Sequence, residues 1–280
     1  MPSHDEIRAA QRAAWDGLSA GWEKWDAVIM DQMGPVSTAM VERLEIADDQ
    51  RHLDIASGTG EPGLTVALRA PRGRVVLTDL SAEMLAVAAR RAEGQGVTNV
   101  ETRVCSADDL PFADATFDSV SVRFGYMFLP DLTAATAEFV RVLRPGGRLC
   151  ASVWVRPEQN PWTSILMEEI GAEAALPPPD PDGPSMFRCA APGLVAGLYE
   201  AAGLRDVAEW DVRVELVTRS PEEYWAVMSE HVSLAVAALA RVGDAARERI
   251  AAAVVARASA YESGGAVRVP GMARCIVGTA

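Results

Sequence analysis

The segment LDIASGTGEPG, residues 53–63, places three glycines directly after a short apolar run. Gly58, Gly60 and Gly63 give the spacing G-x-G-x-x-G. Glycine has no Cβ and adopts positive φ readily, so such a loop lets the backbone approach a ligand closely. The spacing is typical of a pyrophosphate site at a helix N-terminus, and a bare strand-to-helix turn is the alternative without a ligand.

Two carboxylates near this loop argue against a phosphate ligand. Asp54 lies just before the loop, where its charge opposes a polyanion, and the loop lacks the Lys-Ser/Thr pair of a P-loop. Asp79 ends the next apolar run and can accept hydrogen bonds from both hydroxyls of a ribose. These residues favour S-adenosyl-L-methionine, which carries an ammonium, a sulfonium and a ribose but no phosphate. The alternative for Asp79 is an acid that only caps the next helix.

The methyl group on a sulfonium is already electrophilic, so its transfer needs alignment and exclusion of water rather than a covalent nucleophile. A hydroxyl or carbon acceptor can still need a general base. His4 lies near the terminus and His52 at the opening of a strand, which leaves His231 as the candidate catalytic base; the alternative for it is a packed helical histidine. We expect no metal site, because no two of the four cysteines are close in sequence: Cys105, Cys150, Cys189 and Cys275.

Strands alternating with helices must position these residues. We expect strands over 51–55, 74–79, 100–104, 117–123 and 147–155, and helices over 64–70, from Ser81 to about Gly94 and from Asp131 to the RPGG stop. The pattern predicts a parallel, doubly wound α/β sheet, in which ligands bind at the carboxyl ends of the strands. Residues 5–47 are expected to be helical with an interruption near Gly34-Pro35. After 190 we expect a helix over 191–203, a strand over 205–217, a helical stretch over 221–260 and a last strand over 273–279.

Composition limits the classes of partner. The 280 residues are 49% hydrophobic and carry a formal net charge of −13. An excess of acid repels phosphate backbones, so we expect no nucleic acid and no anionic membrane as partner. The N-terminus lacks an apolar signal region and no apolar stretch reaches about 18 residues, so we expect a cytoplasmic protein with reduced thiols. The oligomeric state stays open.

The chain resembles the class I S-adenosylmethionine-dependent methyltransferases, and most closely the type 11 group around the ubiquinone and menaquinone C-methyltransferases. The resemblance runs from about Trp15 to Trp154 and rests on LDIASGTGEPG, VVLTDLSAEML, SADDLPFADATFDSVSVRFG and RVLRPGGRL, in this order and at matching spacing. It implies a Rossmann-like, mostly parallel sheet of seven strands. From the order of the elements we expect one domain over 1–280, with a helical lid at 1–47, a cofactor-binding core at 48–156 and a substrate cap at 157–190 and 221–265.

The resemblance also implies the cofactor site. Asp54 and the glycine loop surround the methionine part, Asp79 binds the ribose, and Ser106 stands where many relatives have Asp. The implied cofactor-binding residues are Trp22, Asp54, Ala56, Ser57, Gly58, Gly60, Asp79, Leu80, Met84, Ser106, Ala107, Asp108 and Arg123.

Aromatic and methionine side chains after the fourth strand are candidates for the acceptor pocket, although such residues are more often ordinary core. The substrate candidates are Tyr126, Met127, Trp154, Trp162, Phe187 and Trp225, taken from a wider set that includes Phe128, Met186, Tyr224 and Met228. We expect methyl transfer to a small, largely apolar acceptor, at oxygen or carbon, as in the tailoring of natural products. The alternatives are a quinone-pathway C-methyltransferase, a protein that binds S-adenosylmethionine without transferring methyl and, more distantly, a nicotinamide dehydrogenase.

Overall fold

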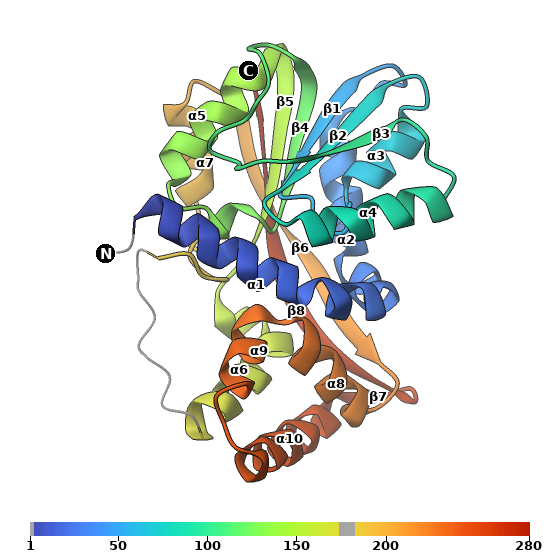
Figure 1. Cartoon of the computed structure of the whole chain (residues 1–280), viewed down its shortest axis with the longest axis vertical. Coiled ribbons are helices and arrows are strands. Elements are labelled where there is room, and N and C mark those ends of the chain that lie inside the picture. The colour runs from blue at the N-terminus through green and yellow to red at the C-terminus, as the bar shows by residue number, and fades with distance from the viewer. Residues whose placement is uncertain (1–2, 174–182) are drawn as a thin grey trace.

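A central β-sheet with the strand order β3-β2-β1-β4-β5-β8-β6 organises the chain, seen in a computed structural model that describes residues 3–173 and 183–280 (Figure 1). Neighbours from β3 to β5 are parallel, and β8 runs antiparallel between β5 and β6. The strands are β1 (Arg51–Ile55), β2 (Arg74–Asp79), β3 (Val100–Val104), β4 (Phe117–Arg123), β5 (Leu143–Trp154), β6 (Arg205–Thr218) and β8 (Ala266–Thr279). This confirms the expected doubly wound sheet of seven strands, to which a two-residue strand, β7 (Glu262–Ser263), adds on β8.

Helices connect and cover the strands. α3 and α4 pack on β1 to β3, while α5 and α7 pack on each other and on β5, β6 and β8. The helices are α1 (His4–Lys24), α2 (Asp26–Leu44), α3 (Gly63–Arg69), α4 (Ala82–Gly94), α5 (Leu132–Val142), α6 (Pro161–Glu173), α7 (Leu194–Ala201), α8 (Pro221–His231), α9 (Ser233–Leu239) and α10 (Asp244–Ala258), with the 3₁₀ turns η1 (Tyr126–Phe128), η2 (Pro157–Gln159) and η3 (Ser259–Tyr261).

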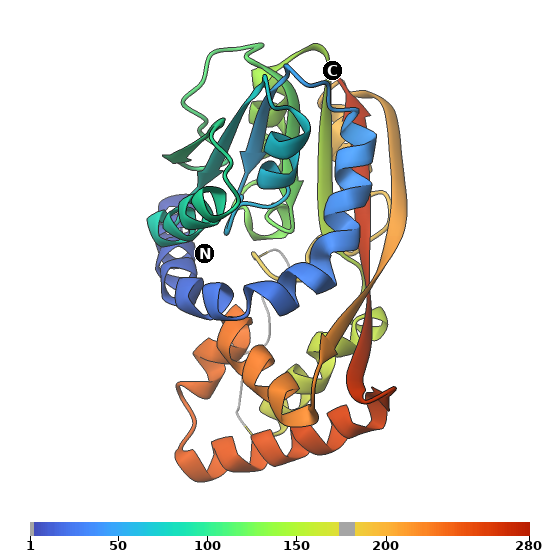
Figure 2. The same ribbon diagram turned by 90° about the vertical axis from the view of Figure 1, so that its right-hand side faces the viewer.

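The expected break near Gly34-Pro35 is wrong. The N-terminal helical region divides at Trp25 instead, whose indole Nε1 donates to Glu230 at 2.8 Å. Pro35 lies inside α2, which bends along its length in Figure 2 but does not end. Proline removes the hydrogen bond to the carbonyl four residues earlier, which here belongs to the exposed Asp31, so water can replace the missing donor.

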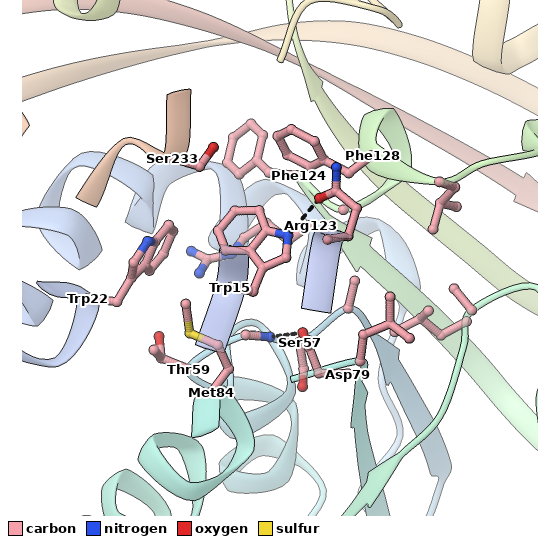
Figure 3. Close-up of a pocket in the computed structure, with 18 of the residues that line it drawn as sticks. Trp15, Trp22, Ser57, Thr59, Asp79, Met84, Arg123, Phe124, Phe128 and Ser233 are labelled. Atoms are coloured by element: carbon pink, nitrogen blue, oxygen red, sulfur yellow. Dashed lines mark hydrogen bonds between the residues drawn. The ribbon is translucent and has the colours of Figure 1, made fainter. Parts of the chain in front are cut away.

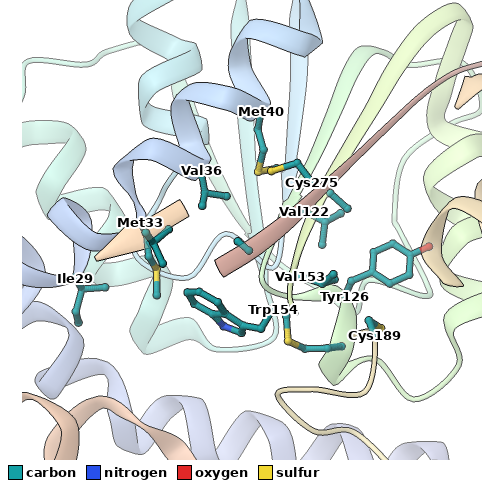
Figure 4. Close-up of a cluster of buried hydrophobic side chains, with 14 of the residues drawn as sticks. Ile29, Met33, Val36, Met40, Val122, Tyr126, Val153, Trp154, Cys189 and Cys275 are labelled. Atoms are coloured by element: carbon teal, nitrogen blue, oxygen red, sulfur yellow. The ribbon is translucent and has the colours of Figure 1, made fainter. Parts of the chain in front are cut away.

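α2 belongs to the core of the sheet rather than to a lid. It packs along β5, β6 and β8, and Figure 4 shows Val36 and Met40 of this helix on the side of the buried strand residues Val122 and Cys275. These side chains are fully buried, which stabilises each by about 1.5–3 kcal/mol relative to exposure to water. α1 is thus the part of the N-terminal region that lies over the carboxyl ends of the strands.

β6 and β8 continue past the other strands as a two-stranded ribbon. They pair from Arg205 and Thr279 to Thr218 and Val267, whereas β5 pairs with only the final part of β8, from Ala273 onward. The last strand is thus longer than expected, because alternating burial of Val267, Val269 and Ala273 continues beyond the sheet. α6, α8, α9 and α10 form the lower lobe beside this ribbon (Figure 1). The expected helical stretch over 221–260 is divided into α8, α9 and α10. Residues 174–182 of the expected cap lie outside the described residues.

Candidate functional site

A cavity lies at the carboxyl ends of β1, β2 and β4, and α1 covers it. Most of the side chains expected at a site do line this cavity. The expected residues that line it are Trp22, Ala56, Ser57, Gly58, Asp79, Leu80, Met84, Ser106, Ala107, Arg123, Trp154, Trp162 and His231. Asp54, Gly60, Asp108, Tyr126, Met127, Phe187 and Trp225 are absent from its described lining.

The glycine loop forms the floor of the cavity. Ala56, Gly58 and Gly60 have φ values of 51°, 52° and 106°, the left-handed region that glycine adopts without strain. The backbone turn presents Ser57 Oγ and Thr59 Oγ1, both buried and both without a hydrogen-bond partner within residues 3–173 and 183–280. A buried hydroxyl without a partner is costly, so this floor suits a ligand with polar groups.

Asp79 lies at the end of β2 beside this loop. Its Oδ2 accepts from the backbone N–H of Gly58 and its Oδ1 from that of Ser81, both at 2.9 Å. Burial raises the pKa of the carboxyl, against the lowering effect of these hydrogen bonds. Each carboxylate oxygen has a second lone pair, so Asp79 can hold Ser81, the N-cap residue of α4, and accept from a ligand hydroxyl at once.

Asp54 does not reach the cavity. Its carboxyl supports the loop from beneath, in place of the expected contact with a ligand. It is fully buried, and its carboxyl accepts from the backbone N–H of Gly63 at 2.9 Å and from Ser121 Oγ at 2.6 Å. Burial raises its pKa to about 7. Ser121 also bonds His52, so a buried polar chain ties β1 to β4 beneath the loop. Gly60 likewise packs inward, where a Cβ would lie 2.9 Å from Leu64.

α1 closes one end of the cavity beside Leu80, Met84 and Ala107. Arg8 of α1 lines this end and pairs with Asp108, with Nη2 to Oδ2 at 2.7 Å and Nε to Oδ1 at 3.1 Å. Asp108 also accepts from Ser106 Oγ. The carboxylate of Asp108 is therefore occupied by the helix and does not face a ligand.

The other end of α1 docks on the end of α8. Trp22 Nε1 donates to the backbone oxygen of His231 at 3.2 Å, and Lys24 pairs with Glu230 at 2.7 Å. Gly21 makes the contact so close that a Cβ there would lie 2.2 Å from the backbone oxygen of Glu230. Figure 3 shows Trp15 and Trp22 of this helix in the cavity, between Ser57, Asp79 and Met84 below and Phe124, Phe128 and Ser233 above.

Aromatic rings line the part of the cavity above Trp15. Phe124 stacks on Trp154 with ring centroids 4.1 Å apart, and Trp15 meets Phe128 edge to face at 5.4 Å. We call this set the aromatic compartment: Trp15, Trp22, Phe124, Phe128, Trp154 and Trp162.

Four of the expected substrate residues lie elsewhere. The 3₁₀ turn η1 directs Tyr126 and Met127 into the core, where the Tyr126 hydroxyl bonds Thr136, and leaves Phe128 on the cavity. Phe187 and Trp225 are half-buried against the core. This single turn thus places Tyr126 in the core and Phe128, two residues later, on the cavity.

Arg123 brings a buried positive charge to the cavity wall. Its guanidinium donates to Ser37 Oγ at 3.1 Å and lies 3.8 Å from Met30 Sδ, and within the described chain it has no ion pair. Burial lowers its pKa, although an arginine stays charged. Glu61 lines the same cavity, with Oε1 3.6 Å from Arg91. Opposite charges near one wall suit the zwitterionic end of an amino acid.

His231 is buried at the end of α8 and lines the aromatic compartment. Its Nδ1 lies 2.7 Å from the backbone oxygen of Val227, so Nδ1 carries the proton and Nε2 is left as an acceptor. Burial lowers the pKa of the imidazole to about 4, so it is neutral near pH 7.

The sequence expectations missed several lining residues, among them Arg8, Gln11, Thr59, Glu61, Phe124 and Ser233. Thr59 and Glu61 stand inside the glycine segment, so their position was a usable signal. Arg8 and Gln11 had no such signal in the sequence, because only the docking of α1 brings them to the strand ends.

Comparisons with known proteins agree with this geometry. A family model described as a methyltransferase domain matches residues 53–147. An uncharacterised protein of Mycobacterium tuberculosis is 34% identical over 197 residues, 69% of this chain and 71% of that protein. The demethylmenaquinone methyltransferase of Thermus thermophilus is 45% identical over 102 residues, but these span only 36% of this chain and 45% of that enzyme.

The fold is also found among solved structures. A putative methyltransferase from Bacillus halodurans superposes with a TM-score of 0.55 over 87% of this chain and 97% of its own, at 19% identity. At that identity the likeness shows the fold alone.

Proposed function

We propose that this chain, which belongs to the class I S-adenosylmethionine-dependent methyltransferases, transfers a methyl group from S-adenosyl-L-methionine to a small, largely apolar acceptor. The observation that carries the proposal is one cavity with two chemically distinct parts. A polar floor of loop hydroxyls and Asp79 faces a compartment walled by aromatic rings. The first suits a nucleoside with an amino-acid tail and the second an apolar acceptor.

The residues present fit the cofactor. Asp79 keeps free lone pairs for the ribose hydroxyls, and the unpartnered hydroxyls of Ser57 and Thr59 can bond its polar groups. Arg123 and Glu61 offer one charge each to the carboxylate and ammonium of the methionine part. When bound, the cofactor supplies an electrophilic methyl group on a sulfonium.

The protein's own contribution is alignment and exclusion of water. Trp15 and Trp22 lie across the cavity between its two parts, and α1 is anchored at both ends by Arg8 and Lys24. We propose that α1 is a lid that opens for the acceptor, and that α6 and α8–α10 form the substrate cap. His231 is the proposed base for an acceptor that loses a proton.

Two other functions are kept because specific observations allow them. The Thermus relative acts on demethylmenaquinone by its name, so a quinone-pathway C-methyltransferase remains the alternative, although the match covers less than half of that enzyme. Binding of the cofactor without methyl transfer is the third. The net charge of −13 favours a small-molecule acceptor over nucleic acid, and we propose a cytoplasmic location.

The test is calorimetric titration with S-adenosylhomocysteine and with NAD, followed by incubation with S-adenosylmethionine and candidate acceptors. We expect S-adenosylhomocysteine to bind, NAD not to bind, and S-adenosylhomocysteine to accumulate only with an acceptor present. Binding of NAD alone would contradict the cofactor. Binding of S-adenosylhomocysteine with no turnover on quinols or other aromatic acceptors would favour the protein without methyl transfer.

A further inference from the structure

The aromatic compartment is selective in shape. Its rings meet each other stacked or edge to face, with Phe124 and Trp154 at 4.1 Å, Trp154 and Trp162 at 4.8 Å, and Trp15 and Phe128 at 5.4 Å. Further rings bind well in such a lining, because stacked and edge-to-face pairs add about 0.5–1.5 kcal/mol each to the burial of their area. A planar aromatic acceptor therefore fits this compartment better than an aliphatic chain.

His231 brings a hydrogen-bond acceptor to this largely aromatic lining. The Nδ1–H of His231 is held by the backbone oxygen of Val227 at 2.7 Å, and within the described residues Nε2 has no hydrogen-bond partner. His231 lines the cavity, so a ligand that brings a donor to Nε2 gains a hydrogen bond that a ligand without a donor lacks. The hydroxyl of Ser233 lines the same cavity and is the rival partner.

Trp22 keeps the imidazole in this orientation. Its indole N–H donates to the backbone oxygen of His231 at 3.2 Å, and its ring packs edge to face on the imidazole with centroids 5.9 Å apart. Since Val227 holds one side of the imidazole and Trp22 packs on its face, the ring has little freedom to turn Nε2 away. Trp22 is thus a positioning residue for His231.

We infer that the acceptor is an aromatic ring bearing a hydroxyl group, that this hydroxyl donates to Nε2 of His231, and that methylation takes place on its oxygen. The inference rests on the proposed methyl transfer. In the reaction the hydroxyl oxygen forms a bond to the methyl carbon, the bond from that carbon to sulfur breaks, and its electron pair stays on sulfur. The hydroxyl proton passes to Nε2 and later to water, so the products are an aryl methyl ether, S-adenosylhomocysteine and one proton.

The weak basicity of His231 is sufficient for this acceptor. Burial lowers the pKa of the imidazole to about 4. As the aryl oxygen gains a methyl group it becomes positively charged, and such an oxonium is a far stronger acid than this imidazolium. An alkylammonium would instead hold its proton against so weak a base, so the site favours a hydroxyl over an aliphatic amine, and the aromatic amine is left to the experiment.

The experiment compares 2-naphthol, naphthalene and 2-naphthylamine with the full chain. Equilibrium dialysis in the presence of S-adenosylhomocysteine measures binding, and mass spectrometry with NMR identifies methylated products formed with S-adenosylmethionine. We expect 2-naphthol to bind roughly five- to tenfold more tightly than naphthalene, the effect of one hydrogen bond, and to give the methyl ether.

His231→Asn is the decisive variant, because the asparagine amide can keep the bond to the backbone of Val227 but has no counterpart of Nε2. The preference for 2-naphthol over naphthalene should disappear, and ether formation should fall about 10²- to 10⁴-fold. His4→Asn, the same change at the exposed start of α1, is the matched control. Binding of S-adenosylhomocysteine should be unchanged in both variants.

The outcomes separate the two proposals. If S-adenosylhomocysteine does not bind the wild-type protein, the proposed function fails. If it binds but 2-naphthol has no advantage, or keeps its advantage in His231→Asn, the hydroxyl inference is overturned and the proposed function stands. Methylation on carbon or on the amine also overturns it, as does loss of the preference in Ser233→Ala together with its retention in His231→Asn.

Discussion

The carboxylate of Asp79 offers the sharpest test of the cofactor site, because the structure gives it two roles at once. It accepts from the backbone N–H of Gly58 and from that of Ser81, each at 2.9 Å, and so holds the loop and begins α4. The remaining lone pair on each oxygen is available to a ribose hydroxyl. Asp79→Asn keeps the size of the side chain but replaces one accepting oxygen with a donor.

The size of the effect follows from the bonds lost. One ribose hydroxyl loses a charge-assisted partner, which contributes about 1.5–3 kcal/mol. At about 1.4 kcal/mol for each factor of ten, the dissociation constant for S-adenosylhomocysteine should rise roughly 10- to 100-fold. The amide nitrogen also faces a backbone N–H, so the free energy of unfolding should fall by about 1–3 kcal/mol.

Calorimetric titration measures the affinity, and circular dichroism with urea unfolding shows that the variant is folded. Asp131→Asn is the matched control, because it is the same change at a carboxylate that caps a helix outside the cavity lining. Asp131 Oδ1 accepts from the backbone N–H groups of Thr133 and Ala134 at the start of α5, each at 2.9 Å. The affinity of this variant should stay within about twofold of wild type. A folded Asp79→Asn protein with unchanged affinity would refute the reasoning and leave Asp79 as a helix cap only.

Two more predictions follow from buried contacts. In α1, Gly21→Ala should push the helix off α8, because the new Cβ would lie 2.2 Å from the backbone oxygen of Glu230. The free energy of unfolding should fall by about 1–3 kcal/mol, and the affinity for S-adenosylhomocysteine should fall with it. Gly17→Ala, with no atom within 4 Å of the new Cβ, should instead stabilise by about 0.5–1 kcal/mol and leave affinity unchanged; equal effects of the two changes would contradict docking of α1. Asp54 has a folded pKa of about 7, above its unfolded value, so the native state holds the extra proton and stability falls as pH rises from about 4 to 7. Asp54→Asn has no such proton to lose. Urea unfolding at pH 5, 6 and 7 should therefore show the free energy of unfolding of the variant rising relative to that of the wild type, by up to about 1.4 kcal/mol per pH unit. Parallel pH profiles of the two proteins would contradict the raised pKa of Asp54.

The first four strands could be predicted to the residue because their signals are local. β1, β2 and β4 are short, mostly buried runs, and β3 alternates β-branched with charged residues. All four end abruptly, at Ala56 and the glycine loop, at Asp79, at Cys105 and at Phe124. Such runs carry their own boundaries, and the helices between them begin at Ser81 and Asp131, whose side chains do accept from backbone N–H groups of the first turn. The order of the sheet then follows from the family.

The surroundings of a side chain could not be predicted where its partner is distant in sequence. The carboxyl of Asp54 is turned inward by Ser121, which follows it by 67 residues, so position before the loop was a misleading guide to ligand contact. In the same way, Arg8 reaches the cavity through Asp108, 100 residues away. Neither partner is marked by any local pattern, because tertiary packing alone brings them together.

The two ends of α1 connect the two parts of the cavity. At one end Arg8 occupies Asp108 beside Leu80 and Met84, and at the other Trp22 holds the backbone of His231. The ion pair at the first end is bidentate and its carboxylate is buried, and Ser81 Oγ donates to Asp16 of the same helix at 2.6 Å. We propose that these contacts hold α1 over the cofactor end, and that docking of its other end sets His231 in place. We propose that closure over the cofactor and alignment of the base are one movement, which is complete when both ends of α1 are docked.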